Sequence, residues 1–125
     1  HFLDSVPKSE VTRHWSLLDV SIIHLRKTEL FNSVIPSKLF ECMAMGIPVL
    51  HGVPGESADI VRREDVGEVF ESSDAQQLVK GLMRLRSDAA RYERYRLNGP
   101  RAAAKYDRTA LASEMLAILQ SCKTK

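Results

Sequence analysis

The residues best suited to chemistry in this sequence lie close together, in the stretch 32–49. Ser37, Lys38 and Glu41 supply a hydroxyl, a cation and a carboxylate at helical spacing. Residues three or four positions apart share one face of a helix, so a helix here would present all three together. The free N–H groups at a helix start, reinforced by the helix dipole, bind phosphate groups. A carboxylate one turn further on can accept from ribose hydroxyls, so the stretch predicts a site for a nucleotide diphosphate.

The same residues also have a structural interpretation, which the sequence leaves open. Lys38 and Glu41 would then form only a surface ion pair worth less than about 1 kcal/mol, and Pro36-Ser37 would only begin a helix. In either case the apolar residues of the helix are expected to face a sheet, namely Leu39, Phe40, Met43 and Ala44.

The four histidines are scattered, and no metal-ligand spacing occurs. We therefore expect no metal site. His24 and His51 each lie near the end of a predicted strand, where they could line a cleft, or could cap or border the core.

Strand and helix signals alternate along the chain. Pro36 suits the first turn of a helix, and Gly46 suits its end. Elements in this order form a parallel sheet covered by helices, so the predicted class is α/β with a Rossmann-like parallel sheet. Ligands of such sheets bind beyond the carboxyl ends of the strands, which points to the loops after Leu25 and His51. Apolar runs predict strands at 19–25, 48–51 and 67–71, and spaced apolar residues predict helices at 7–18, 36–45 and 56–63.

Three further helices are predicted toward the C-terminus. Ser73 and Gln76 form a capping-box pattern that would open the first of them. The second begins near Asp88, and Gly99-Pro100 is expected to break it. The last begins near Arg108. Their expected apolar stripes are Leu78, Leu82 and Leu85, flanked by Val79 and Met83, in the first, and Leu111, Met115, Ile118 and Leu119 in the last.

The composition is that of one ordinary domain of 125 residues, with 44% hydrophobic and 27% charged residues. The net charge of +2 gives no general signal for nucleic acid. Cys42 and Cys122 are too few for a disulfide framework, which favours a reducing, cytoplasmic compartment. No apolar run approaches the roughly 20 residues of a membrane span, and no signal peptide is visible. Because the chain opens on His1, we expect it to be cut from something longer.

Basic residues dominate the stretch 80–108, which carries nine of them against three acidic ones. They would suit anionic lipid headgroups, or they would form a solvated helix face. Without a recognised binding motif, no nucleic-acid partner is expected. The nine are Lys80, Arg84, Arg86, Arg91, Arg94, Arg96, Arg101, Lys105 and Arg108.

The central stretch resembles the donor-site segment of GT-B glycosyltransferases of family 4. Their pattern is a glutamate, seven residues, a second glutamate, a helix of small residues and Gly-x-Pro-Val. Glu41 matches the second glutamate and 46–49 matches the ending, whereas Ser33 replaces the first glutamate and Val34 and Pro36 replace glycines. The segments 35–41 and 52–56 are similar to the WbuB-like and colanic-acid-type enzymes of bacterial surface polysaccharides.

This resemblance implies a retaining transfer of sugar from a nucleotide-sugar, usually a UDP-sugar, with no separate cofactor. Glu41 would bind the ribose, and the backbone N–H groups of Val34, Ile35 and Ser37 would face the diphosphate or the donor sugar. Pro36 has no N–H to offer. Lys38 would stabilise the leaving diphosphate. Ser33 cannot replace a carboxylate, and no catalytic residue is assigned.

The resemblance covers almost the whole chain but only the last two-thirds of the family's second domain. We therefore expect 1–125 to be a single partial domain, with a C-terminal helix over 108–125. A missing N-terminal domain would contact the glycan or lipid-linked acceptor, with peripheral contact at the inner face of the membrane. Absent strands would leave the edge of the 19–25 strand open. The isolated chain is expected to lack transferase activity, which turnover of any UDP-sugar would contradict.

Two other functions remain open. The first is a catalytically silent interaction module or remnant of the same fold, which Ser33 and the missing upstream part favour. The second is a sugar-nucleotide epimerase half-domain, which would convert a free UDP-sugar without an acceptor.

Overall fold

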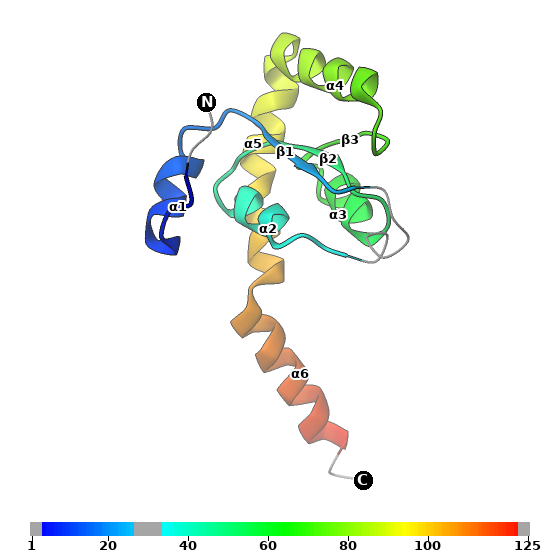
Figure 1. Ribbon diagram of the computed structural model, residues 1–125. Coiled ribbons are helices and arrows are strands. Elements are labelled where there is room, and N and C mark those ends of the chain that lie inside the picture. The colour runs from blue at the N-terminus through cyan, green and yellow to red at the C-terminus, as the bar shows by residue number, and fades with distance from the viewer. Residues whose placement is uncertain (1–3, 27–33, 123–125) are drawn as a thin grey trace.

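Three short parallel strands form the centre of the fold in a computed structural model that describes residues 4–26 and 34–122 (Figure 1). They are β1 (Ser21–His24), β2 (Val49–Gly52) and β3 (Gly67–Val69), in the order β1-β2-β3. Ile23 pairs in register with His51, which in turn pairs with Val69. The predicted class, a parallel sheet flanked by helices, is confirmed.

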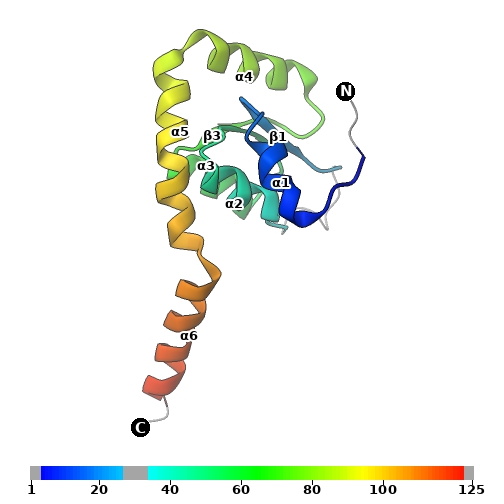
Figure 2. The same cartoon turned by 90° about the vertical axis from the view of Figure 1, so that its left-hand side faces the viewer.

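Helices cover both faces of this sheet. As Figures 1 and 2 show, α2 and α3 lie on one face and α4 on the other, while α5 runs along both layers. Below α5, the helix α6 continues away from the sheet. The bounds are α1 (Lys8–Trp15), α2 (Ser37–Ala44), α3 (Glu56–Glu64), α4 (Ala75–Ser87), α5 (Ala89–Ala103), the 3-10 helix η2 (Ala104–Tyr106) and α6 (Arg108–Cys122).

The core is divided by the sheet because side chains alternate between the two faces of a strand. On one face, Ile23 and Val49 pack with buried residues of α2 and α3. On the other, Leu50 packs with Leu85 of α4 and Tyr95 of α5. β1 is buried on the first face only, since Ile22 and His24 are exposed.

Two glycines bring α2 and α5 close together. Gly46 ends α2 with a φ of +65°, a conformation that favours glycine. A Cβ at Gly99 would lie 2.6 Å from the carbonyl oxygen of Met43, so only glycine allows this approach. The predicted break at Gly99-Pro100 is wrong, because α5 runs through both residues. Pro100 removes one N–H from the helix, but tertiary packing against α2 holds the helix together.

The start of α4 also differs from its prediction. Asp74 caps the helix by accepting from the N–H of Gln77, whereas Ser73 has a left-handed φ of +73°. The Gln77 side chain accepts instead from the N–H of Glu71. Both Ser and Asp are good N-caps, so the sequence alone did not separate them.

The predicted apolar stripes of the C-terminal helices are only partly buried. In α4, Leu85 is buried and Leu78 half-buried. The rest of the α4 stripe is exposed, and so are all four stripe residues of α6, which has no buried residue. Helix α4 lies at the border of the described structure, with neighbours on one side only, and α6 extends away from the body (Figure 2).

Several expectations fall outside the described residues. They concern the opening strand near Phe2-Leu3, most of the loop after Leu25, and Ser33. Within the described ranges, no helix combines the length and the apolar composition that a membrane crossing requires.

Candidate functional site

Helix α2 presents the chemistry-bearing residues because its opposite face is anchored in the core. Leu39, Cys42 and Met43 are buried, whereas Ser37, Lys38 and Glu41 are exposed. All three are therefore exposed, as the predicted helix face requires. Burial raises the pKa of the Cys42 thiol to about 11, which is typical of a packed and unreactive cysteine. The expectation that Ala44 faces the sheet is wrong, since it is exposed, and Phe40 is only half-buried.

The start of α2 lacks a side-chain cap. Pro36 stands at the N-cap with ψ of 127° and offers no side-chain acceptor. Its carbonyl accepts from the N–H of Leu39, which leaves the N–H groups of Ser37 and Lys38 pointing out of the helix start. Val34 and Ile35 precede this turn and are half-buried, and Ile35 packs against the core.

A groove of about 610 Å³ lies beside this helix. Ser37 and Glu41 line it from α2, and Lys8 lines it from α1. Lys38 does not line it, so the structure separates two residues that the sequence grouped. The remaining lining residues are Val11, Thr12 and Trp15 of α1, Phe40, Ala44 and Met45 around α2, and Ala103, Tyr106, Asp107 and Arg108 near the start of α6.

Tyr106 fixes the far wall of this groove. Its ring lies against that of Phe40, with centroids 5.0 Å apart. Its hydroxyl lies 3.0 Å from Glu64 Oε1, and Lys105 Nζ lies 2.6 Å from Glu64 Oε2. The hydrogen bond from Lys105 lowers the pKa of the Glu64 carboxyl below its ordinary value. These contacts connect Phe40 of α2, the residue before Glu41, to η2 and α3.

The two histidines at strand ends differ in their surroundings. His51 is fully buried, and its Nε2 lies 2.7 Å from Ser57 Oγ. Burial lowers its pKa to about 4, so the imidazole is neutral. It lines none of the hollows described here and belongs to the core.

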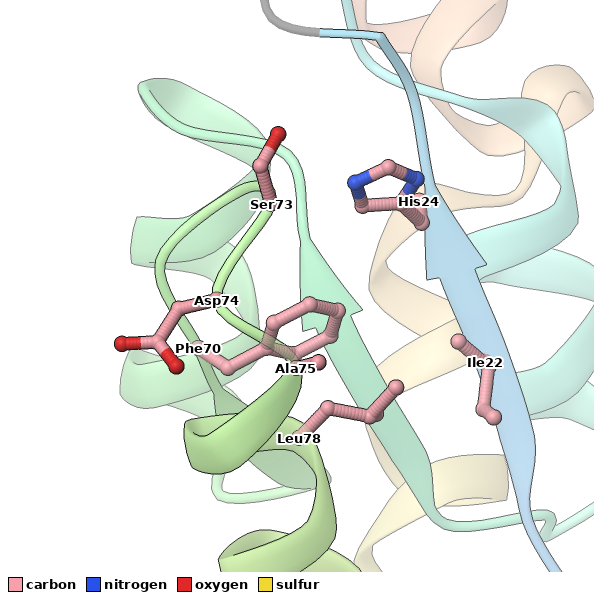
Figure 3. A pocket seen from close by; sticks show the side chains of 7 residues that line it. All are labelled: Ile22, His24, Phe70, Ser73, Asp74, Ala75 and Leu78. Atoms are coloured by element: carbon pink, nitrogen blue, oxygen red, sulfur yellow. The ribbon is translucent and has the colours of Figure 1, made fainter.

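His24 lines a mainly apolar pocket of about 290 Å³ between β1 and α4 (Figure 3). Its ring is stacked near Phe70, with centroids 6.0 Å apart, and Ile22 and Leu78 close the pocket. His24 thus lines a cleft, which was one of the two roles that the sequence left open for it. This cleft is separate from the groove beside α2.

A third hollow, of about 320 Å³, lies at the carboxyl ends of β2 and β3. Pro54 and Gly55, in the loop after β2, line it together with Arg62. Arg62 donates to Asp59 at 3.0 Å, so its charge is already paired.

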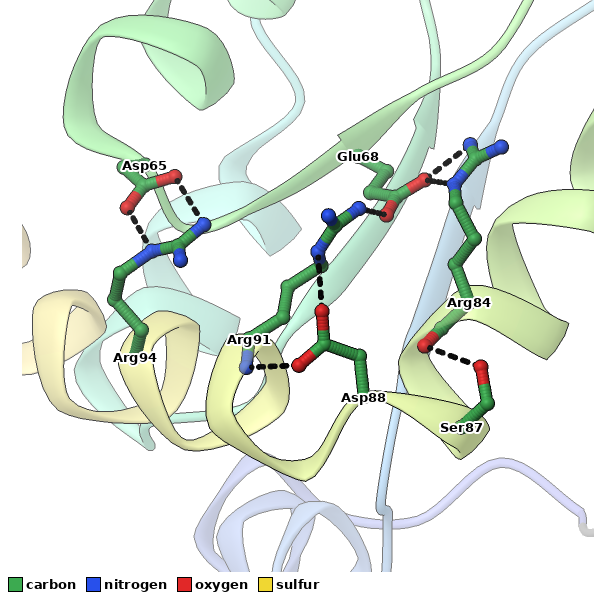
Figure 4. A network of polar contacts seen from close by, with 7 residues as sticks. All are labelled: Asp65, Glu68, Arg84, Ser87, Asp88, Arg91 and Arg94. Carbon is green, nitrogen blue, oxygen red and sulfur yellow. Dashed lines mark hydrogen bonds and ion pairs between the residues drawn. The ribbon is translucent and has the colours of Figure 1, made fainter.

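The basic stretch is largely neutralised by neighbouring carboxylates. Glu68 on β3 accepts from both Arg84 and Arg91, and Asp65 accepts from Arg94 at 2.7 Å (Figure 4). Arg96 pairs with Glu93 and Lys105 with Glu64. The pairs to Glu68 join α4 and α5 to β3. Together the pairs leave less free positive charge for lipid headgroups than the sequence suggests.

Sequence reasoning missed Lys8, Trp15 and Arg108 as neighbours of Ser37 and Glu41. They come from helices distant in the chain, and no local pattern indicates that α1 and the start of α6 border α2. Among the residues described, no group of three or more His, Cys, Asp or Glu side chains could hold a metal ion.

Comparison with known proteins adds a family and a fold. A family model described as "Glycosyl transferases group 1" matches residues 1–102. Sucrose-phosphate synthase from Thermosynechococcus elongatus is similar in structure, with a TM-score of 0.74 and 19% sequence identity. The match covers 99% of this chain but only 30% of that one, which makes the present fold a partial GT-B Rossmann-like domain. No curated protein matches the chain.

Proposed function

Because the chain belongs to the group 1 glycosyl transferases, we propose that it is the nucleotide-sugar-binding part of a retaining, family 4-like enzyme. The donor is a UDP-sugar, and the acceptor is a surface polysaccharide or a lipid-linked glycan. The observation that carries this proposal is the groove beside α2, where Ser37 and Glu41 lie on one wall.

The proposed roles follow from the position of each group. The Glu41 carboxylate is exposed in the groove and accepts hydrogen bonds from the ribose hydroxyls. The N–H groups of Val34, Ile35 and Ser37 lie before or at the uncapped start of α2, where they donate to the diphosphate. Lys38 follows Ser37 and adds positive charge near this turn. A groove of this volume lies within the range of ligand pockets.

Transfer itself is proposed for a longer polypeptide that contains this chain. The chain spans 30% of the sucrose-phosphate synthase that it matches. Acceptor contacts are assigned to the part of the enzyme outside this chain, in keeping with the absence of any assigned catalytic residue here. Peripheral contact with the inner face of the membrane belongs to the same proposal.

Titration of the chain with UDP tests the binding role. Trp15 is the sole tryptophan and lines the groove, so its fluorescence reports on occupancy, with calorimetry as a second readout. Glu41→Gln removes the charged acceptor and is expected to weaken UDP binding about tenfold or more. Glu56→Gln, an exposed carboxylate at the start of α3, is the matched control and should bind as the parent does. Equal affinities for the two variants would contradict the role of Glu41.

The same titration addresses the silent interaction module, which Ser33 favours because it stands where the family has its first glutamate. A chain that shows no saturable UDP binding would support that module over the donor site. Conversion of a free UDP-sugar without an acceptor would support an epimerase instead.

A further inference from the structure

One cation of the groove comes from outside the motif that the sequence singles out. Lys8 is the first residue of α1, and it lines the groove together with Ser37 and Glu41 of α2. Lys38, the cation that the sequence favours, does not line the groove. The lysine that lines the groove in the structure is therefore Lys8 and not Lys38.

Four charged residues line the groove in the described part of the chain. Glu41 and Asp107 are negative, and Lys8 and Arg108 are positive. Asp107 is engaged as the cap of α6, where its Oδ1 accepts from the N–H groups of Thr109 and Ala110, both at 3.0 Å. Arg108 belongs to the start of α6 and lies beside Asp107 in the chain.

Lys8 is available for a ligand. Its side chain is exposed, and within 4–26 and 34–122 no ion pair or hydrogen bond joins it to another residue. A lysine ammonium is a compact charge on a flexible stem, and it binds phosphate oxygens without a fixed geometry. A diphosphate in this groove would be repelled by the Glu41 carboxylate unless a cation on the facing helix offsets that charge.

Building on the proposed function, we propose that Lys8 is a diphosphate-binding cation of the donor site. With Glu41 on the ribose, the phosphates of the same nucleotide extend toward α1, and Lys8 donates to their oxygens. Lys38 lies outside the groove and does not contact the phosphate oxygens there. Lys8 therefore discriminates a nucleoside diphosphate from the free nucleoside, whereas Glu41 acts on both.

The test compares UDP with uridine, using calorimetry and Trp15 fluorescence on the full chain. Lys8→Gln is expected to weaken UDP binding about tenfold while uridine binding stays within about twofold. Lys80→Gln makes the same change of charge on the exposed side of α4, outside the groove, and is expected to leave both affinities unchanged. Lys8→Arg keeps the charge and should restore most of the UDP affinity. Circular dichroism checks that each variant is folded.

The outcomes separate this inference from the proposed function. Loss of UDP affinity in Lys8→Gln, with uridine affinity retained, supports the inference. UDP binding that depends on Glu41 but not on Lys8 would overturn the inference alone. An equal loss for uridine and UDP would make Lys8 a packing residue and overturn it as well. If UDP does not bind the parent chain, the proposed function fails and the role of Lys8 fails with it.

Discussion

At the level of single residues, the region around α2 keeps packing and chemistry on separate sides. Leu39, Cys42 and Met43 are buried, and Ser37 and Glu41 face the groove.

His51 shows how burial alone lowers the pKa of a titratable group. It is fully buried on the central strand, and its pKa of about 4 lies far below the ordinary value of 6.5.

The buried His51 predicts a pH-dependent stability. In the unfolded chain the imidazole takes up a proton as the pH falls below about 6.5, but in the folded chain it does so only near pH 4. The contribution of His51 to the free energy of unfolding therefore has its full value above pH 6.5. It decreases by roughly 2–3 kcal/mol as the pH falls toward 4. Urea denaturation between pH 7 and pH 4 measures this slope.

His51→Gln should flatten the slope, because its amide can still bond to Ser57 but does not titrate. His14→Gln, at a half-buried site on α1, is the control and should keep the parent's slope. A His51→Gln chain with an unchanged slope would assign the pH dependence to other groups.

At the level of elements, the contact between α2 and α5 positions the candidate site. Gly99 lets the carbonyl of Met43 approach α5, and Gly46 ends α2 next to the carbonyl of Arg96. Tyr106, just beyond α5, then lies against Phe40. The direction in which Glu41 points thus depends on how α2 lies on α5.

Gly99→Ala tests this contact. The new Cβ would lie 2.6 Å from the Met43 carbonyl oxygen, so one helix must move. The expected loss is about 1–3 kcal/mol in the free energy of unfolding, although alanine is intrinsically the better helix former. Gly81→Ala, in the interior of α4, is the comparison, because its Cβ would lie 3.1 Å from the side chain of Leu50 rather than against backbone. Chemical denaturation should show a larger loss for Gly99→Ala than for Gly81→Ala. A Gly99→Ala chain as stable as the parent would show that α2 and α5 do not approach tightly at this point.

At the level of the whole molecule, α6 stands apart from the body. It continues below α5 without covering the sheet (Figures 1 and 2). None of its residues is buried, and Leu111, Met115, Leu116, Ile118 and Leu119 are each about half exposed. Exposed apolar surface of this kind promotes association.

Removal of 109–125 is therefore expected to change the unfolding free energy of the body by less than about 1 kcal/mol, because little buried surface is lost. Trp15 fluorescence during urea denaturation measures the body directly. Light scattering of the shortened chain should show less association than the full chain at equal concentration. A loss of several kcal/mol would mean that α6 contributes to the fold of the body.

The sequence by itself determined the order of strands and helices, the end of α2 at Gly46 and the exposed face that Ser37 shares with Glu41. These features follow from local periodicity and from residues with strong backbone preferences, which act over a few positions. The resemblance of 32–49 to a donor-site segment likewise predicted a glycosyltransferase, and the match over 1–102 shows a group 1 glycosyl transferase, whereas the assignment to family 4 stays a prediction.

Only the tertiary structure decided which helices meet. It placed Lys8 and Trp15 in the groove that Glu41 lines, left Lys38 outside it and kept α5 continuous through Pro100. It also paired Glu68 with two arginines of the basic stretch. Each of these results depends on contacts between segments far apart in the chain. Local patterns fix the period of an element, but the packing of many side chains at once fixes its neighbours.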